Sequence, residues 1–136
     1  MRPDEGFTFA FNNREPVYLQ VVRHFKIWIA TGRLRAGQTI PSRRELAVLA
    51  KINPNTAQRA YREMEEQRLI VTEGNSPSRI TGDERILRSV RSELLEEAVD
   101  RFMELIGHID VSTEELVALV RQKHAALRNG GNTGHD

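Results

Sequence analysis

Cysteine is absent from this chain of 136 residues, which excludes disulfide bonds and thiolate chemistry. No apolar run approaches the roughly 20 residues that a membrane-spanning helix needs. The first six residues lack the basic start and apolar stretch of a signal peptide and carry acidic side chains instead. We therefore expect a cytoplasmic protein with no membrane partner.

Catalytic motifs are also missing. The sequence holds no nucleophile–base set, no phosphate-cradling glycine loop and no paired carboxylates in a suitable context. The four histidines lack the spacing of a metal site, although His108, Asp110 and His124 would meet if two C-terminal helices folded together. A metal-dependent hydrolase is thus one alternative, but we expect no enzyme activity, no metal and no cofactor.

Charge is present in both signs but is unevenly distributed. Residues 1–80 hold 13 Lys and Arg against 8 Asp and Glu, whereas residues 81–136 hold 7 against 11. A basic part of about +5 joined to an acidic part of about −4 fits a surface that meets a polyanion, followed by a segment with another role. The length suits one small globular domain with an appendage.

Two neighbouring segments have the pattern of a helix-turn-helix. In the first, Ser42 is a suitable helix cap with Glu45 three residues on, and a basic pair follows the cap, so a helix is expected over about 43–50. In the second, Asn53 caps a helix and Pro54 occupies its first position. This second helix has one apolar and one polar face. The apolar face carries Ala57, Ala60, Tyr61 and Met64, and the polar face carries Asn55, Gln58, Arg59 and Arg62. Because Asn and Gln pair with adenine and Arg with guanine, the polar face is suited to DNA.

The segments around this motif complete a small domain. Apolar residues at steps of three and four predict a helix from about Pro16 to Thr31. Residues 8–11 alternate like a short strand, and residues 34–40 are expected to form a connecting turn. Residues 69–72 and 78–81 have strand composition around a turn at 73–77, which predicts a two-stranded wing after the recognition helix.

From Asp83 onward the periodicity predicts one long amphipathic helix, broken at Gly107, and a second, shorter helix that starts at Ser112. The apolar stripe of these helices is too wide to remain in water, and the small basic domain cannot cover all of it. We expect it to form a dimer interface made of Leu87, Val90, Leu94, Leu95, Ala98, Val99, Phe102, Leu105, Ile106, Leu116 and Val120.

The expected fold is therefore mainly α. It comprises an N-terminal strand or arm (1–13), a winged helix-turn-helix domain with a small β wing (14–82; helix-turn-helix about 42–66, wing about 69–81) and a C-terminal two-helix dimerisation arm (83–128). The glycine-rich polar tail, residues 129–136, is expected to be disordered.

Taken in order, these motifs resemble the GntR family of bacterial repressors over residues 8–81. The resemblance is carried by residues 16–20, Gly32, Leu34, Gly37, residues 41–47, residues 53–56, and Ala60 with Tyr61. The short two-helix C-terminal part is similar to the YtrA subfamily, whose members are homodimers held by those helices. The resemblance implies a homodimeric transcription regulator that represses by occupying an inverted-repeat operator, which in this subfamily often belongs to a transporter operon.

The resemblance also implies which residues meet double-stranded DNA. Arg44 and the exposed start of the third helix are expected at the DNA, and the wing at its edge. The residues so assigned are Ser42, Arg43, Arg44, Asn53, Asn55, Thr56, Gln58, Arg59, Gly74, Asn75 and Arg79. Two places depart from the family: the wing has one glycine and has Arg79 where an apolar residue is commoner, and Gln67 and Arg68 replace a usual glycine.

The second alternative is a winged-helix module that docks a partner protein and has no DNA affinity.

A small-molecule effector would have to act by changing the angle between protomers, since the separation of the two DNA-binding units in a dimer must match the spacing of the half-sites. The sequence identifies neither an effector nor the operator.

Overall fold

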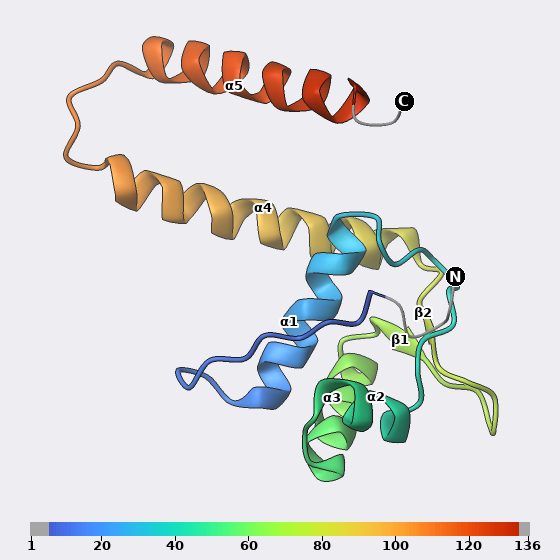
Figure 1. Cartoon of the computed structure of the whole chain (residues 1–136). Coiled ribbons are helices and arrows are strands. Elements are labelled where there is room, and N and C mark those ends of the chain that lie inside the picture. Colours follow the sequence, from blue (N-terminus) through green and yellow to red (C-terminus); the bar gives the residue numbers. More distant parts are fainter. Residues whose placement is uncertain (1–5, 134–136) are drawn as a thin grey trace. The chain divides into compact units, whose positions relative to one another are not determined.

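The structure is a computed structural model that describes residues 6–133 (Figure 1). It divides into two compact units, Met1–Val99 and Asp100–Asp136. The elements in chain order are α1 (Val17–Ala30), α2 (Arg43–Ala50), α3 (Pro54–Glu66), β1 (Ile70–Val71), β2 (Arg79–Ile80), α4 (Glu84–Ile106) and α5 (Thr113–Thr133). No helix within the described range is both long and apolar enough to cross a membrane.

The core of the N-terminal unit forms between α1 and α3. Val21 and Phe25 of α1 are completely buried, as are Tyr61 and Met64 of α3. The rings of Phe25 and Tyr61 meet edge to face, with centroids 6.2 Å apart. Since buried aromatic side chains remove the most apolar area from water, this contact fixes α3 on α1 and leaves the opposite face of α3 outward.

The helix-turn-helix is defined by local caps. Ser42 Oγ accepts from the Glu45 N–H and Glu45 Oε1 accepts from the Ser42 N–H, both at 3.1 Å, which completes a capping box at the start of α2. The hydrogen bond from the Ser42 backbone is the main reason that the pKa of Glu45 lies below its ordinary value. Lys51 adopts a left-handed conformation with φ of 56°, and Asn53 Oδ1 then accepts from the Asn55 N–H at 2.8 Å to start α3.

A third backbone segment is hydrogen-bonded to the two-stranded wing, which the sequence does not predict. β1 and β2 pair antiparallel, with Ile70 opposite Ile80. Residues 37–40, predicted as a connecting turn, lie along the other edge of β2. Their hydrogen bonds run from Gly37 N–H to Ile80 O (2.9 Å), from Ile80 N–H to Gln38 O (2.8 Å) and from Ile40 N–H to Ser78 O (3.0 Å). The wing is therefore anchored to the segment that enters α2, because an unpaired edge of β2 recruits the nearest extended backbone.

The predicted strand at residues 8–11 does not form. This segment is extended but has no strand partner among the described residues. It is held instead by aromatic packing: the rings of Phe7 and Phe9 lie 5.2 Å and 5.3 Å from that of Trp28, both edge to face. The alternation of Phe7, Phe9 and Phe11 thus serves packing on α1 and not a sheet. Residues 1–5 of the predicted arm lie outside the described range.

The first part of α4 belongs to the N-terminal unit. Val90 is only 2% exposed, and Leu87 and Leu94 pack half-buried against the same core. The assignment of Val90 to a dimer interface is therefore wrong, because the chain's own core already covers it. Ion pairs add to this attachment: Arg23 Nη1 lies 2.7 Å from Glu97 Oε2, and Lys26 Nζ lies 3.2 Å from Glu93 Oε1.

The second C-terminal helix, α5, starts where the sequence predicts. Ser112 Oγ accepts from the Glu115 N–H at 3.1 Å. The helix continues to Thr133 instead of ending near residue 128, so the predicted disordered tail is helical over residues 129–133. A glycine weakens a helix by about 1 kcal/mol but leaves its hydrogen bonds intact, and no proline interrupts this segment. Residues 134–136 lie outside the described range.

The turn after α3 stores backbone strain. Arg68, which with Gln67 replaces a glycine that is usual in the family this chain resembles, has a φ of 63°. A side chain in this left-handed region costs roughly 1 kcal/mol that glycine avoids. We expect Arg68→Gly to raise the free energy of unfolding by about 0.5–1 kcal/mol, measured by urea denaturation. Arg68→Ala is the matched control, since it removes the side chain and keeps the strain; an R68G protein no more stable than R68A would contradict the explanation.

Candidate nucleic-acid interface

The outward face of α3 is polar and open. Asn55, Gln58, Arg59 and Arg62 are exposed, and Thr56 is half-buried at the edge of this face. Asn53 is engaged as the cap of α3, so its side-chain oxygen already has a partner. The predicted recognition residues therefore occupy one surface, with amide and guanidinium groups that can contact base edges.

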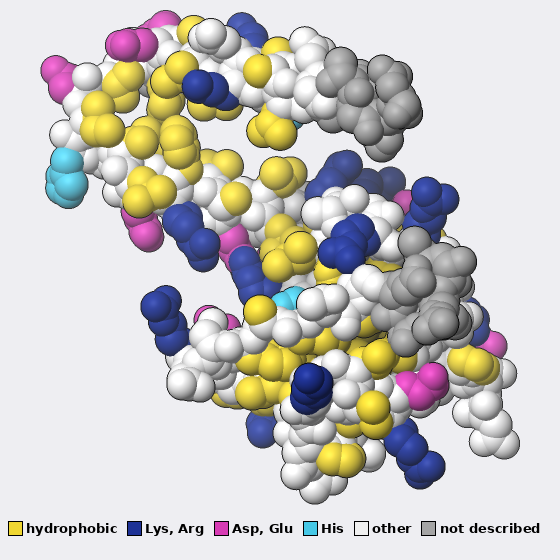
Figure 2. All heavy atoms as spheres, viewed as in Figure 1, with side chains coloured by type: hydrophobic (Ala, Val, Ile, Leu, Met, Phe, Trp, Pro, Cys, Tyr) yellow, Lys and Arg dark blue, Asp and Glu magenta, His cyan; other side chains and the backbone are white. Residues whose placement is uncertain are grey.

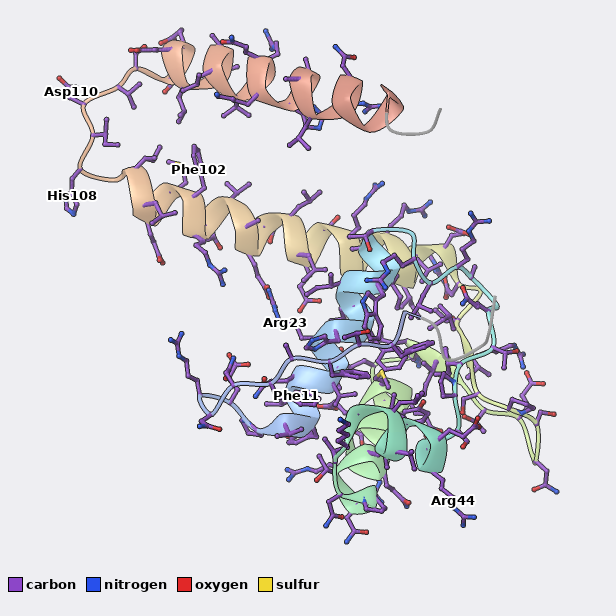
Figure 3. The ribbon with its side chains drawn as sticks, in the orientation of Figure 1. Phe11, Arg23, Arg44, Phe102, His108 and Asp110 are labelled. Atoms are coloured by element: carbon purple, nitrogen blue, oxygen red, sulfur yellow. The ribbon has the colours of Figure 1, made fainter. Side chains whose placement is uncertain are left out.

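Arg44 is the uncompensated cation of α2. Its side chain is exposed and projects away from the helix (Figure 3), and none of the described residues pairs with it. A guanidinium without a counter-ion keeps its full charge and all five donors for an anion. Arg44 is therefore well placed to contact a phosphate.

Its neighbour Arg43, also predicted to meet DNA, is engaged within the domain. Arg43 Nη2 forms an ion pair with Glu65 Oε1 of α3, and its guanidinium carbon lies 5.8 Å from the centroid of the Tyr61 ring. Tyr61 in turn donates its hydroxyl hydrogen bond to the Pro41 carbonyl, and burial raises the pKa of this phenol. Arg43 thus ties α2 to α3, since its charge is balanced inside the domain.

A groove of about 770 Å³ separates the start of α2 from the wing. One wall includes Ser42, Arg44 and Glu45, and the other includes Thr72 and residues 75–78. Hydroxyl groups, an amide and a guanidinium therefore face one concave surface. These donors suit the phosphate and sugar groups of a nucleic acid backbone, which provide position and not sequence information.

The wing carries little free positive charge. Arg79 Nη2 lies 2.8 Å from Glu73 Oε1, so the atypical arginine of the wing is paired within the wing itself. The hydroxyl groups of Thr72 and Ser78 hydrogen-bond at 2.6 Å. Gly74 has a φ of 55°, which allows the chain to turn at the exposed tip beside Asn75. Contacts from this tip would be neutral hydrogen bonds.

One residue of the site was missed by sequence reasoning. The guanidinium carbon of Arg59 lies 4.0 Å from the centroid of the Tyr18 ring, and its Nη2 lies 3.3 Å from Tyr18 Oη. Tyr18 is at the start of α1, 41 positions away in sequence. Only its position in the family motif at residues 16–20 draws attention to it, since a single tyrosine on a helix carries no local signal of this contact.

The C-terminal unit exposes apolar side chains. Leu105 is 76% exposed and Leu127 is 75% exposed, and Val117, Leu119 and Val120 are also open. Figure 2 shows hydrophobic side chains along α5 and along the part of α4 that precedes the loop. Of the predicted interface, Leu95, Ala98, Val99, Phe102, Leu105 and Val120 are exposed, whereas Ile106 and Leu116 are half-buried.

The residues of the hydrolase alternative do not assemble. No group of three His, Cys, Asp or Glu side chains within the described part of the chain could hold a metal ion. The side chains of His108 and Asp110 project away from each other on the loop between α4 and α5 (Figure 3). The predicted meeting with His124 therefore does not take place.

A three-helix core with an outward α3, a capped and basic α2, and a small β wing defines a winged helix-turn-helix DNA-binding protein. A family model described as bacterial regulatory proteins, gntR family, matches residues 17–80. A solved GntR family transcriptional regulator from Listeria monocytogenes is 30% identical, with a TM-score of 0.71 over 82% of this chain and 98% of that one. This chain belongs to the GntR family of transcription regulators.

Two relatives from Bacillus subtilis (strain 168) extend the comparison. The uncharacterized HTH-type transcriptional regulator YhcF is 29% identical over 107 residues, which is 79% of this chain and 88% of that protein. The HTH-type transcriptional repressor YtrA is 39% identical over 57 residues, which is 42% of this chain and 44% of that protein. These findings confirm the predicted YtrA-like family, and GntR regulators are not enzymes.

Proposed function

We propose that this chain is a homodimeric repressor that occupies an inverted-repeat operator in the cytoplasm. The observation that carries the proposal is the arrangement of α3 and Arg44: an exposed polar helix face with amide and guanidinium groups lies beside an arginine that has no partner among the described residues. Arg44 differs in this respect from Arg43 and Arg79, whose charges are paired with carboxylates of the same domain.

The proposed DNA contacts divide by chemistry. Asn55, Gln58 and Arg59 enter the major groove and read base edges, each bidentate pair contributing about 1–3 kcal/mol of discrimination. Arg44 and the hydroxyl groups of the groove between α2 and the wing hold the backbone. A helix of this diameter fits the major groove of B-DNA, so the two roles are compatible in one docking geometry.

The proposed dimer is supported by the exposed apolar side chains of the C-terminal unit. Isolated helices with open leucines and valines leave a large hydrophobic area in water, and a second copy of the same surface would cover it. Two DNA-binding units joined in this way would contact two half-sites about one helical turn apart. Repression then requires only that the bound dimer exclude the transcription machinery.

The direction of regulation rests on similarity. The relative YtrA is named a transcriptional repressor, and the 57 matched residues correspond in extent to a DNA-binding domain. The YtrA resemblance also suggests a transporter operon as the target.

The proposal is tested by selecting duplexes from a random DNA pool with the purified protein and by titrating the DNA upstream of its own gene at two salt concentrations. We expect enrichment of an inverted repeat, tight binding that weakens steeply with salt, and a dimer by light scattering. A protein that enriches no sequence and binds no DNA at low salt would contradict the proposal and favour a protein-interaction module.

A further inference from the structure

Arg59 is held differently from the other arginines of the DNA-binding surface. The planar guanidinium lies 4.0 Å from the centroid of the Tyr18 ring and makes one hydrogen bond to the hydroxyl group of that ring, at 3.3 Å. No ion pair to Arg59 occurs within the described residues, although Glu63 follows it by one helical turn. An aromatic ring attracts the cation but does not neutralise it.

This arrangement leaves most of the guanidinium free. Arg has five N–H donors in a fixed plane, and Tyr18 uses one of them. The remaining edge stays able to pair bidentately with a guanine or an oxygen pair of similar spacing. An unconstrained Arg59 would populate many rotamers and would lose that freedom on binding. When Arg59 is stacked on Tyr18, it has lost much of this rotamer freedom before it binds DNA.

We infer that Tyr18 is a positioning residue for base recognition: its ring holds Arg59 so that the free guanidinium edge is oriented for a guanine in the major groove. The inference rests on the proposed function, because it requires Arg59 to read DNA. It adds a residue of α1, outside the helix-turn-helix, to the determinants of sequence preference. The ring supplies the orientation, and the hydroxyl group supplies a smaller part of it.

The test compares Tyr18→Leu, Tyr18→Phe, Arg59→Ala and the double variant Tyr18→Leu/Arg59→Ala. Leucine keeps the apolar body that packs beside the core, and phenylalanine keeps the stacking ring. Circular dichroism and thermal melting first establish that each variant is folded. Binding is then measured to the duplex that the wild-type protein selects from a random pool, and to the duplexes with each single base-pair change in one half-site.

We expect Y18L to weaken binding by about 5- to 20-fold and Y18F to stay within about 3-fold of wild type. In both Y18L and R59A, the lost discrimination should fall at the same base pair, and Y18L should have no further effect in the R59A background. A purely structural role for Tyr18 predicts instead an equal loss on every duplex that adds to the loss from R59A, and this result would overturn the inference. Tighter binding by Y18L would also overturn it, since it would mean that the ring withholds Arg59 from DNA.

Failure of the proposed function gives a different result. If the wild-type protein selects no sequence, both the function and the positioning role are wrong. If it selects a sequence but R59A keeps the full base preference, DNA binding stands and only the roles of Arg59 and Tyr18 are refuted.

Discussion

Replacing Arg44 by alanine is expected to weaken operator binding by about 10- to 100-fold, since a charge-assisted hydrogen bond to a phosphate contributes roughly 1.5–3 kcal/mol. The side chain is exposed and has no partner among the described residues, so the substitution should leave the fold intact. Titration of the selected duplex at several salt concentrations measures the effect. The slope of log affinity against log salt should fall by about 1 for each lost phosphate contact.

The matched control for this variant is Arg88→Ala. Arg88 is an exposed arginine of α4, outside the helix-turn-helix, and its removal changes the net charge by the same amount. We expect the R88A protein to bind within about 2-fold of wild type, because screening limits distant charges at moderate salt. Equal losses for R44A and R88A would show that total charge, and not a contact at Arg44, determines the affinity.

Placing a carboxylate in the apolar surface of the C-terminal unit should convert the protein to a monomer. Leu105 is 76% exposed in the protomer, so Leu105→Glu should lower the free energy of unfolding of the protomer only slightly. In a dimer the same carboxylate would be buried against apolar side chains, which costs several kcal/mol. Light scattering at micromolar concentration measures the mass. Operator affinity should also fall by about 100-fold or more, because the two half-sites are no longer bound by one tethered pair.

The control for the oligomeric state is Val48→Glu, which introduces the same charge at an apolar residue of α2 that is 74% exposed. We expect this variant to remain dimeric in the mass measurement. If L105E is dimeric as well, the protomers associate through a surface other than the one proposed. If both variants are monomeric, added negative charge by itself separates the protomers, and the assignment to the C-terminal helices loses its support.

The boundaries of α2 and the start of α3 were predictable from the sequence because their causes are local. Ser42 and Glu45 are three positions apart, and Asn53 acts on an N–H two positions on. The buried face of α3 was predictable for the same reason, since helical periodicity places Ala57 and Tyr61 on one side. The polar face of the candidate site follows from that burial.

Two departures from prediction involve partners that are distant in sequence. Residues 8–11 have the alternation of a strand, but a strand needs a neighbouring backbone, and α1 supplies aromatic contacts instead. Residues 37–40 lack a strong strand pattern, yet they pair because β2 has a free edge beside them. Alternation describes which side chains share a face, and it does not specify what that face meets.

The chemistry of each arginine was likewise decided by tertiary structure. By sequence, Arg43 and Arg44 are equivalent neighbours, yet Glu65 neutralises Arg43 and leaves Arg44 free. Arg59 is held by Tyr18 from another helix. The sequence by itself determined where the helices begin, the caps of α2, α3 and α5, the buried face of α3 and the family, because these depend on residue types at short, fixed spacings. The tertiary structure alone decided which charges stay available to DNA and which part of α4 is covered, because both depend on what packing brings within a few ångströms.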